Sequence, residues 1–399
     1  MDPRRVARNV PLAFAYALFM DFSLTAPIWV LYLRDERGFS MAQITFMEVP
    51  LFLLIVFAEV PTGAVADRYG RRISLLLASS ILAVSMYVYG VARDYALILV
   101  SNLTWALAFT FRSGADTALL YDSLKALGRE AEFQRTFGRL TAVRSAAALG
   151  GLLLGAPLAA ATSYAVAIES TAAVAAVALV VAGLMREAPR EAAAEVAPRG
   201  GYLRTLAGGA REVLEKSALR ALFAFSGVIS AAAAGPLQLL QQPWLTAHDV
   251  GTSKLGLLQA AAHGAALLSA LAAAGLLARL GLRAALAILP AGLFIACGVL
   301  GTLDQLSAGA AFLGIAAVAG LQEPLLSGEI NRQIESSRRA TVLSIKQMFT
   351  NVLMAALWPA VGRSVDKVGL PPVFLFYAFG ALVAGGWSLR VWTRSPEGV

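Results

Sequence analysis

The sequence predicts an all-α integral membrane protein in which twelve transmembrane helices form two pseudo-symmetric bundles of six. Of the 399 residues, 58% are hydrophobic and only 15% are charged, and the mean hydropathy is +0.69. A soluble domain of this composition has too few polar residues to cover its surface, so lipid must serve as part of the solvent. The apolar residues also form long runs, and one polar stretch divides these runs into two sets.

Twelve apolar segments are long enough to cross a bilayer. Twelve helices of ~21 residues would use ~250 residues to cross ~30 Å of hydrocarbon, which leaves room only for short loops and one connector. The first set occupies residues 10–33, 41–62, 73–92, 95–121, 135–160 and 163–185. The second set occupies residues 217–245, 253–280, 282–303, 306–334, 338–362 and 371–394. Residues 1–185 and 217–399 are therefore the predicted N-terminal and C-terminal bundles.

The polar segment 186–216 is the predicted linker between the bundles. It contains Pro189, Pro198 and two consecutive glycines, and it then alternates apolar with charged residues around Val213 and Leu214. This pattern predicts a cytoplasmic linker that ends in a short amphipathic helix.

The net charge of +8 is explained by the membrane rather than by nucleic acid. Lysine and arginine are concentrated in the segments that would share a side with the N-terminus, as the positive-inside rule requires of cytoplasmic segments. We therefore expect both termini in the cytoplasm, a location in a bacterial or archaeal inner membrane, a monomer, and no nucleic-acid partner.

The sequence lacks the usual signatures of an enzyme. Cys297 is the single cysteine and there are two histidines, so neither a disulfide framework nor a zinc cluster is expected. No Walker phosphate loop, GxSxG or HExxH sequence occurs. We expect no enzymatic activity, no metal and no cofactor.

A glycine-rich and arginine-rich segment follows the second predicted span. It reads GAVADRYGRRISL over residues 63–75. Gly63 would allow close backbone approach, and Gly70 can end a helix. The spacing resembles G-x-x-x-D-R-x-G-R-[RK]-x-x-L, the loop signature of the major facilitator superfamily. The matching positions are Gly63, Asp67, Arg68, Gly70, Arg71, Arg72 and Leu75.

Two further segments resemble superfamily motifs. Residues 112–116, RSGAD, are similar to the motif of the fourth helix, and residues 151–157, GLLLGAP, are similar to the Gly/Pro motif of superfamily antiporters, which would indicate export. For the second segment, a GxxxG packing face is the alternative reading. The resemblance implies alternating access, with a cytoplasmic gate in which Arg71 pairs with Asp122 and Glu59 lies nearby.

Ionisable residues inside the spans are the candidate functional groups. Each costs at least ~2.5–3.5 kcal/mol at the bilayer centre, so such residues are retained for a function or a partner. Arg112 and Asp116 are four residues apart and can pair, whereas Asp21 has no basic residue in its own span. The candidates for proton coupling and for the substrate cavity are Asp21, Glu48, Arg112, Asp116, Arg144 and Glu169. In the second half, Glu323 or Glu329 is expected to pair with Lys346 as a lock between helices.

These residues suggest three functions. Loss of water favours the protonated carboxyl group, and the candidates contain more acids than bases, which favours proton-coupled efflux of an amphipathic or cationic compound. One alternative is proton-coupled uptake of an organic anion or nutrient, with Arg112, Arg144 or Lys346 as its ligand. The other is a sensor or scaffold that does not transport. The expected partners are a small-molecule substrate, protons and the lipid bilayer.

Overall fold

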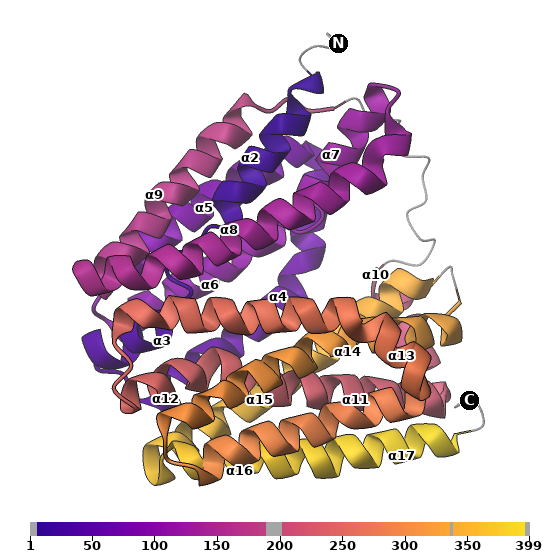
Figure 1. The fold of residues 1–399 in the computed structure, drawn as a ribbon. Helices are drawn as coiled ribbons and strands as arrows, with labels where there is room; N and C mark the ends of the chain where they lie inside the picture. Colours follow the sequence, from indigo (N-terminus) through magenta and orange to yellow (C-terminus); the bar gives the residue numbers. More distant parts are fainter. Residues whose placement is uncertain (1–5, 189–201, 336–337, 396–399) are drawn as a thin grey trace. The chain divides into compact units, whose positions relative to one another are not determined.

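The computed structural model describes residues 6–188, 202–335 and 338–395, and these residues form helices and no strands (Figure 1). The all-α class predicted from the sequence is therefore confirmed. Of the predicted linker, residues 189–201 lie outside the described part of the chain. The chain folds into two compact units.

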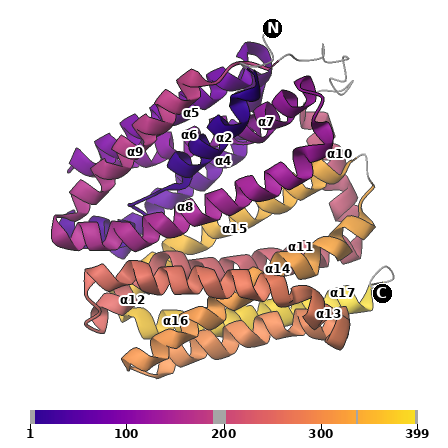
Figure 2. The same ribbon diagram turned by 45° about the horizontal axis from the view of Figure 1, so that its top comes forward.

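The first unit comprises Met1–Phe39, Pro50–Glu195 and Gly251–Leu257. Apart from the start of α13, its helices come from the first half of the chain. They are α2 (Asn9–Asp21), α3 (Trp29–Leu31), η1 (Tyr32–Glu36), α4 (Met41–Tyr69), α5 (Arg71–Val91), α6 (Tyr95–Arg112), α7 (Ala115–Ala126), η2 (Glu130–Glu132), α8 (Phe133–Ala161) and α9 (Tyr164–Leu184). Helix α5 packs against α6 and α9, and α2 runs beside α8 and α9 (Figure 2).

The second unit comprises Ser40–Val49, Val196–Val250 and Leu258–Val399. The first residues of α4 thus group with this unit, and the first residues of α13 group with the other. The helices of the second half are α10 (Tyr202–Glu215), α11 (Ser217–Ala234), η3 (Gly235–Leu240), α12 (Gln241–Ala247), α13 (Thr252–Thr302), η4 (Leu306–Ala310), α14 (Ala311–Gln333), α15 (Arg339–Val368), α16 (Leu370–Gly380), η6 (Ala381–Gly385) and α17 (Gly386–Arg394).

Helix α11 forms the core of the second unit. It packs against α14, α15 and α17. Small buried residues such as Ser226 and Gly227 allow these neighbours to approach closely, because a Cβ atom on Gly227 would lie 2.7 Å from the Phe349 ring.

Nine helices of the described chain are long and apolar enough to cross a membrane. The other three predicted spans depart from this criterion for physical reasons. The span at 10–33 is broken after Asp21, the span at 282–303 is merged into α13 across a kink at Gly281, and α15 carries polar residues along its length.

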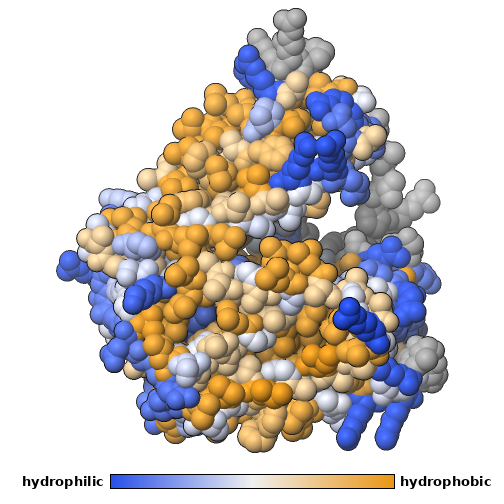
Figure 3. Space-filling view, viewed as in Figure 1, coloured by the Kyte–Doolittle hydropathy of each residue, from blue (hydrophilic) through white to orange (hydrophobic). Residues whose placement is uncertain are grey.

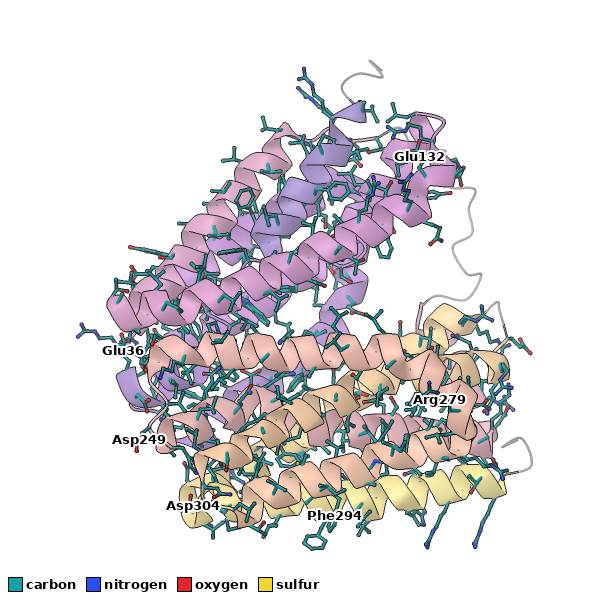
Figure 4. The ribbon with its side chains drawn as sticks, viewed as in Figure 1. Glu36, Glu132, Asp249, Arg279, Phe294 and Asp304 are labelled. Atoms are coloured by element: carbon teal, nitrogen blue, oxygen red, sulfur yellow. The ribbon has the colours of Figure 1, made fainter. Side chains whose placement is uncertain are left out.

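The surface of the molecule agrees with a lipid environment. Apolar side chains cover most of the face seen in Figure 3, and hydrophilic residues gather toward the ends of the helices. In the second unit, Asp249 and Asp304 lie at one end of the helices and Arg279 at the other, whereas Phe294 projects outward between these ends (Figure 4). This distribution keeps charged side chains out of the hydrocarbon core, where they are unfavourable.

Candidate functional site

Two helices of the first unit are interrupted at charged residues. Helix α2 ends at Asp21, where the following Phe22 has φ −84° and ψ 83°. Helix α6 ends at Arg112, and the left-handed Gly114 (φ 73°) separates it from α7. The sequence did not predict the break after Asp21, although Pro27 lies a few residues further on.

Four side chains meet at these interruptions, and we call them the tetrad: Asp21, Arg112, Asp116 and Arg144. Arg112 donates from Nη1 to Asp21 Oδ1 at 2.7 Å and from Nη2 to Asp21 Oδ2 at 2.5 Å. Its Nε donates to Asp116 Oδ2 at 3.0 Å, and this same oxygen accepts a hydrogen bond from Arg144 Nη2. Arg144 Nε lies 3.9 Å from Asp21 Oδ2. The two carboxylates and two guanidinium groups balance in charge.

Helix ends add to the electrostatics of the tetrad. Arg112 lies in the last turn of α6 and Asp116 in the first turn of α7, so each charge faces the partial charge of opposite sign. Asp21 ends α2, where the helix dipole opposes a negative charge, and the bidentate bond from Arg112 offsets this. The side chain of Asp21 is 21% exposed and that of Asp116 is 11% exposed. Asp21 is therefore the more accessible acid.

The non-helical chain between α2 and α3 is stabilised by contacts with α8 and α9. The backbone amide of Leu24 donates to Thr171 Oγ1 on α9 at 3.1 Å, because it has no helical acceptor. A Cβ atom on Gly155 would lie 2.2 Å from the Leu24 carbonyl oxygen, and one on Gly151 would lie 2.5 Å from the Ser23 carbonyl oxygen. The glycines of α8 therefore form a packing face for the interrupted segment.

The glycine-rich and arginine-rich segment is mostly helical and is not the loop that the sequence predicted. Helix α4 continues through Gly63 and Asp67 to Tyr69, and Gly70 with φ 115° is the break before α5. No described atom lies within 4 Å of a Cβ atom built on Gly63, so the predicted close approach is not found there. Asp67 and Arg68 are exposed on the last turns of α4.

Arg71 and Asp122 are paired in the structure. Arg71 Nη1 donates both to Asp122 Oδ2 and to the Ala118 carbonyl, the latter at 2.8 Å. Arg72 reaches the Gly183 carbonyl on α9 at 2.8 Å. These contacts join the start of α5 to α7 and α9 within the first unit.

Two residues at this end of the unit were missed by the sequence reasoning. Glu187 accepts hydrogen bonds from the backbone amides of Arg71 and Arg72, each at 2.9 Å, and so caps α5. Asn9 exchanges hydrogen bonds with the Arg186 backbone at 2.8 and 2.9 Å, and it also donates to Ser123 Oγ at 2.9 Å. Glu187 is the first of several glutamates in the predicted linker, so its residue type alone did not distinguish it.

The remaining acids of the first half lie apart from the tetrad. Glu169 lies against α5, where a Cβ atom on Gly90 would come within 2.7 Å of its Cγ atom. Glu48 belongs to the part of α4 that groups with the second unit. Glu59 is exposed on α4.

In the second unit, Lys346 pairs with Glu323 and not with Glu329. Lys346 Nζ on α15 donates to Glu323 Oε2 on α14 at 2.6 Å. Glu329 instead accepts hydrogen bonds from Arg332 and, at 2.8 Å, from Gln333 Nε2. Gln322, which the sequence reasoning also missed, donates to Ser226 and Ser230 of α11 at 2.8–3.1 Å.

Paired charges inside long apolar helices, some of them interrupted at those charges, are typical of membrane transport proteins. Residues 12–321 match the family model described as Major Facilitator Superfamily. The chain belongs to this superfamily of transporters.

Comparison with curated proteins supports the same family over a shorter stretch. The uncharacterized MFS-type transporter YxaM of Bacillus subtilis (strain 168) is 30% identical over 96 residues. This alignment spans 24% of this chain and 24% of that relative.

Solved structures share the fold over nearly the whole chain. The nucleoside transporter NupG has a TM-score of 0.79 at 14% identity, covering 99% of this chain and 100% of that one. A POT family transporter in complex with 5-aminolevulinic acid has a TM-score of 0.70 at 15% identity, covering 98% and 97%. A D-xylose-proton symporter has a TM-score of 0.68 at 14% identity, covering 98% of each chain.

Proposed function

We propose that this protein is a proton-coupled secondary transporter of a small organic molecule, and that the tetrad couples proton binding to transport. The observation that carries the proposal is the bidentate bridge between Asp21 and Arg112 at the interruption of two membrane helices. Interrupted helices place backbone dipoles and side chains at the sites of secondary transporters. Superfamily membership supplies the expected mechanism of alternating access.

Proton binding to Asp21 would change the tetrad from neutral to positively charged. The guanidinium group of Arg112 would then lose the negative charge of the carboxylate that both its Nη atoms bind. Removing one member of a buried ion pair is strongly unfavourable, because the other charge is left without compensation. The protonated state would therefore favour a different arrangement of α2, α6 and α7, which is the differential interaction that a population shift requires.

The charge balance of the tetrad bears on the cargo. The expectation of a cationic cargo rested on an excess of acids, but Asp21 and Asp116 each face a guanidinium group. An anionic cargo would have to displace these carboxylates from Arg112 and Arg144. Because the tetrad has no excess of either charge, it favours neither a cationic nor an anionic cargo.

Transport into reconstituted vesicles under an imposed proton gradient tests the proposal. The probes are radiolabelled D-xylose and uridine as neutral solutes, benzoate as an anion and tetraphenylphosphonium as a cation. The gradient is imposed in both directions, with the vesicle interior either acidic or alkaline. We expect the wild type to accumulate a probe under one of these two conditions. We expect Asp21→Asn to lose this response while retaining exchange of the same probe across the membrane.

The matched control is Asp35→Asn, which makes the same chemical change in η1, where Asp35 is 40% exposed beside Arg34. It should leave gradient-driven accumulation intact. Accumulation by the Asp21→Asn protein at the wild-type rate would refute the coupling role. Wild-type vesicles that move every probe no faster than protein-free vesicles would instead favour a sensor or scaffold.

A further inference from the structure

We propose that Glu323 and Lys346 form a cargo-binding subsite in the second unit, and that this subsite takes a neutral solute bearing hydroxyl groups. This inference rests on the proposed transport function and adds the chemical class of the cargo. It replaces the sequence-based expectation that the same pair is a lock between helices.

The Glu323–Lys346 pair is buried on one side only. The side chain of Lys346 is 10% exposed, whereas that of Glu323 is 62% exposed. Lys346 Nζ engages Glu323 Oε2, and among the described residues no donor reaches Glu323 Oε1. The pair therefore presents one carboxylate oxygen, held in place by a buried ammonium group.

Contacts on both sides of Glu323 fix the direction in which it points. The preceding residue, Gln322, is buried and bonded to α11 through Ser226 and Ser230. On another face of α14, Gly320 packs so closely on α13 that a Cβ atom there would lie 2.0 Å from the Ala266 carbonyl oxygen. Successive helical residues point about 100° apart, so Glu323 projects away from the Gln322 contact.

The exposed carboxylate is expected to meet water rather than lipid. Glu323 lies near the middle of α14, which is an apolar membrane helix. Ionised groups at this depth face the interior of a bundle or a water-filled cavity, because hydrocarbon cannot solvate them. A water-facing oxygen at mid-membrane in a transporter is accessible to cargo.

The charge state of the pair selects the class of cargo. Lys346 neutralises Glu323, so no net charge remains to attract a cation or an anion. The oxygen left over can only accept hydrogen bonds, because an ionised carboxylate has no donor. Hydroxyl groups are donors of this kind, and their bonds to a charged acceptor are stronger than bonds between neutral groups.

The tetrad and Glu329 show the contrast. In the tetrad both oxygens of Asp21 are bonded to Arg112, and Glu329 is bonded through both oxygens and is 6% exposed. Glu323 combines a fixed partner with an available oxygen in a way that Asp21 and Glu329 do not.

Isothermal titration calorimetry on the full-length purified protein at one fixed pH tests the subsite. The probes are D-xylose and uridine as neutral hydroxylated solutes, with benzoate and tetraphenylphosphonium as charged comparisons. We expect a hydroxylated probe to bind and Glu323→Ala to weaken that binding by about tenfold or more. The control Glu335→Ala removes an acid that is 66% exposed beside Arg338 and should bind as the wild type does.

The exchanged variant E323K/K346E separates a subsite from a lock. If the pair only joined α14 to α15, the exchange would restore both stability and probe binding, because the ion pair forms again with acid and base interchanged. A subsite predicts that the melting temperature returns to near the wild-type value while probe binding stays lost, since the carboxylate now occupies the buried position.

Three results would overturn the inference: wild-type affinity in Glu323→Ala, restored binding in the exchanged variant, or binding of the charged probes alone. Failure of both hydroxylated probes to bind the wild type would also count against it. Binding at one pH reports on the subsite, whereas accumulation driven by a proton gradient reports on coupling. Loss of coupling and loss of the subsite are thereby observed separately.

Discussion

Asp116 holds two guanidinium groups through a single carboxylate oxygen. Arg112 Nε and Arg144 Nη2 both donate to its Oδ2 atom, while Oδ1 accepts from the backbone amide of Thr117 at 2.6 Å. Asp116 therefore supplies one of the two negative charges that balance Arg112 and Arg144. Its loss would leave one acid for two bases in a region that is largely shielded from water.

Replacement of Asp116 is therefore predicted to destabilise the protein strongly. We expect Asp116→Asn to lower the free energy of unfolding by about 3 kcal/mol, the lower part of the range for removing one partner of a buried ion pair. Denaturant titration in detergent measures this change. The double variant Asp116→Asn/Arg144→Gln should recover a large part of it, because charge balance returns. If the double variant is less stable than the single one by the full cost of a second loss, charge balance is not what the tetrad provides.

Ion pairs between side chains could be predicted from the sequence, whereas the helix cap formed by Glu187 could not. Arg112 and Asp116 are four residues apart in one predicted helix, so spacing indicated that pair. The pair of Arg71 and Asp122 was indicated by the resemblance to the superfamily. Glu187 bonds to backbone amides far along the chain, and amides carry no residue-specific signal. Its role could be recognised only once α5 and the end of α9 were placed together.

The cap by Glu187 is predicted to stabilise the start of α5. We expect Glu187→Ala to lower the free energy of unfolding by about 1 kcal/mol, as is typical for the loss of a helix cap. The control Glu215→Ala removes an acid that is 61% exposed on α10, and it should change stability by less than about 0.5 kcal/mol. Equal effects of the two variants in thermal unfolding would show that the bonds to Arg71 and Arg72 contribute nothing.

At the level of elements, the interruption of α2 is the feature that sequence patterns could not supply. Composition and hydropathy predicted the spans, but the residues that follow Asp21 are as apolar as a continuous helix would require. The conformation is stabilised from outside, by Thr171 of α9 and by the glycines of α8. Tertiary contacts therefore stabilise the break, and Pro27 adds a local effect because it cannot donate a helical hydrogen bond.

Helix α8 offers a direct test of this packing role, because Gly155 lies at the contact and Gly138 lies in open space. Gly155→Ala would bring a Cβ atom within 2.2 Å of the Leu24 carbonyl oxygen. We expect it to lower the melting temperature, with a cost of about 1–3 kcal/mol for overpacking, and to reduce transport.

The matched control is Gly138→Ala on the same helix, where nothing lies within 4 Å of the new Cβ atom. It should leave stability unchanged or slightly raised, since alanine favours helix more than glycine does. A Gly155→Ala protein as stable and active as the Gly138→Ala protein would contradict the packing role of this face.

At the level of the whole molecule, composition was enough to predict the fold class. Few charges, long apolar runs and a superfamily motif predicted a helical membrane transporter, and the family match and the solved structures confirm that fold. The ends of individual helices were harder to predict. Helix α13 continues across the kink at Gly281, and α4 extends to Tyr69 through most of the segment expected to be a loop. The balance of charge within the tetrad required the structure, since a list of acids and bases does not show which of them meet.

The most direct test of proton coupling follows the protonation of Asp21 itself. Attenuated total reflection infrared difference spectra, recorded between neutral and acidic pH on reconstituted protein, resolve the carbonyl band of a protonated carboxyl group without requiring a known cargo. The account predicts that the wild type gains such a band on acidification and that the band is missing in Asp21→Asn but present in Asp35→Asn. Identical difference spectra for the wild type and Asp21→Asn would contradict the claim that Asp21 takes up the coupled proton.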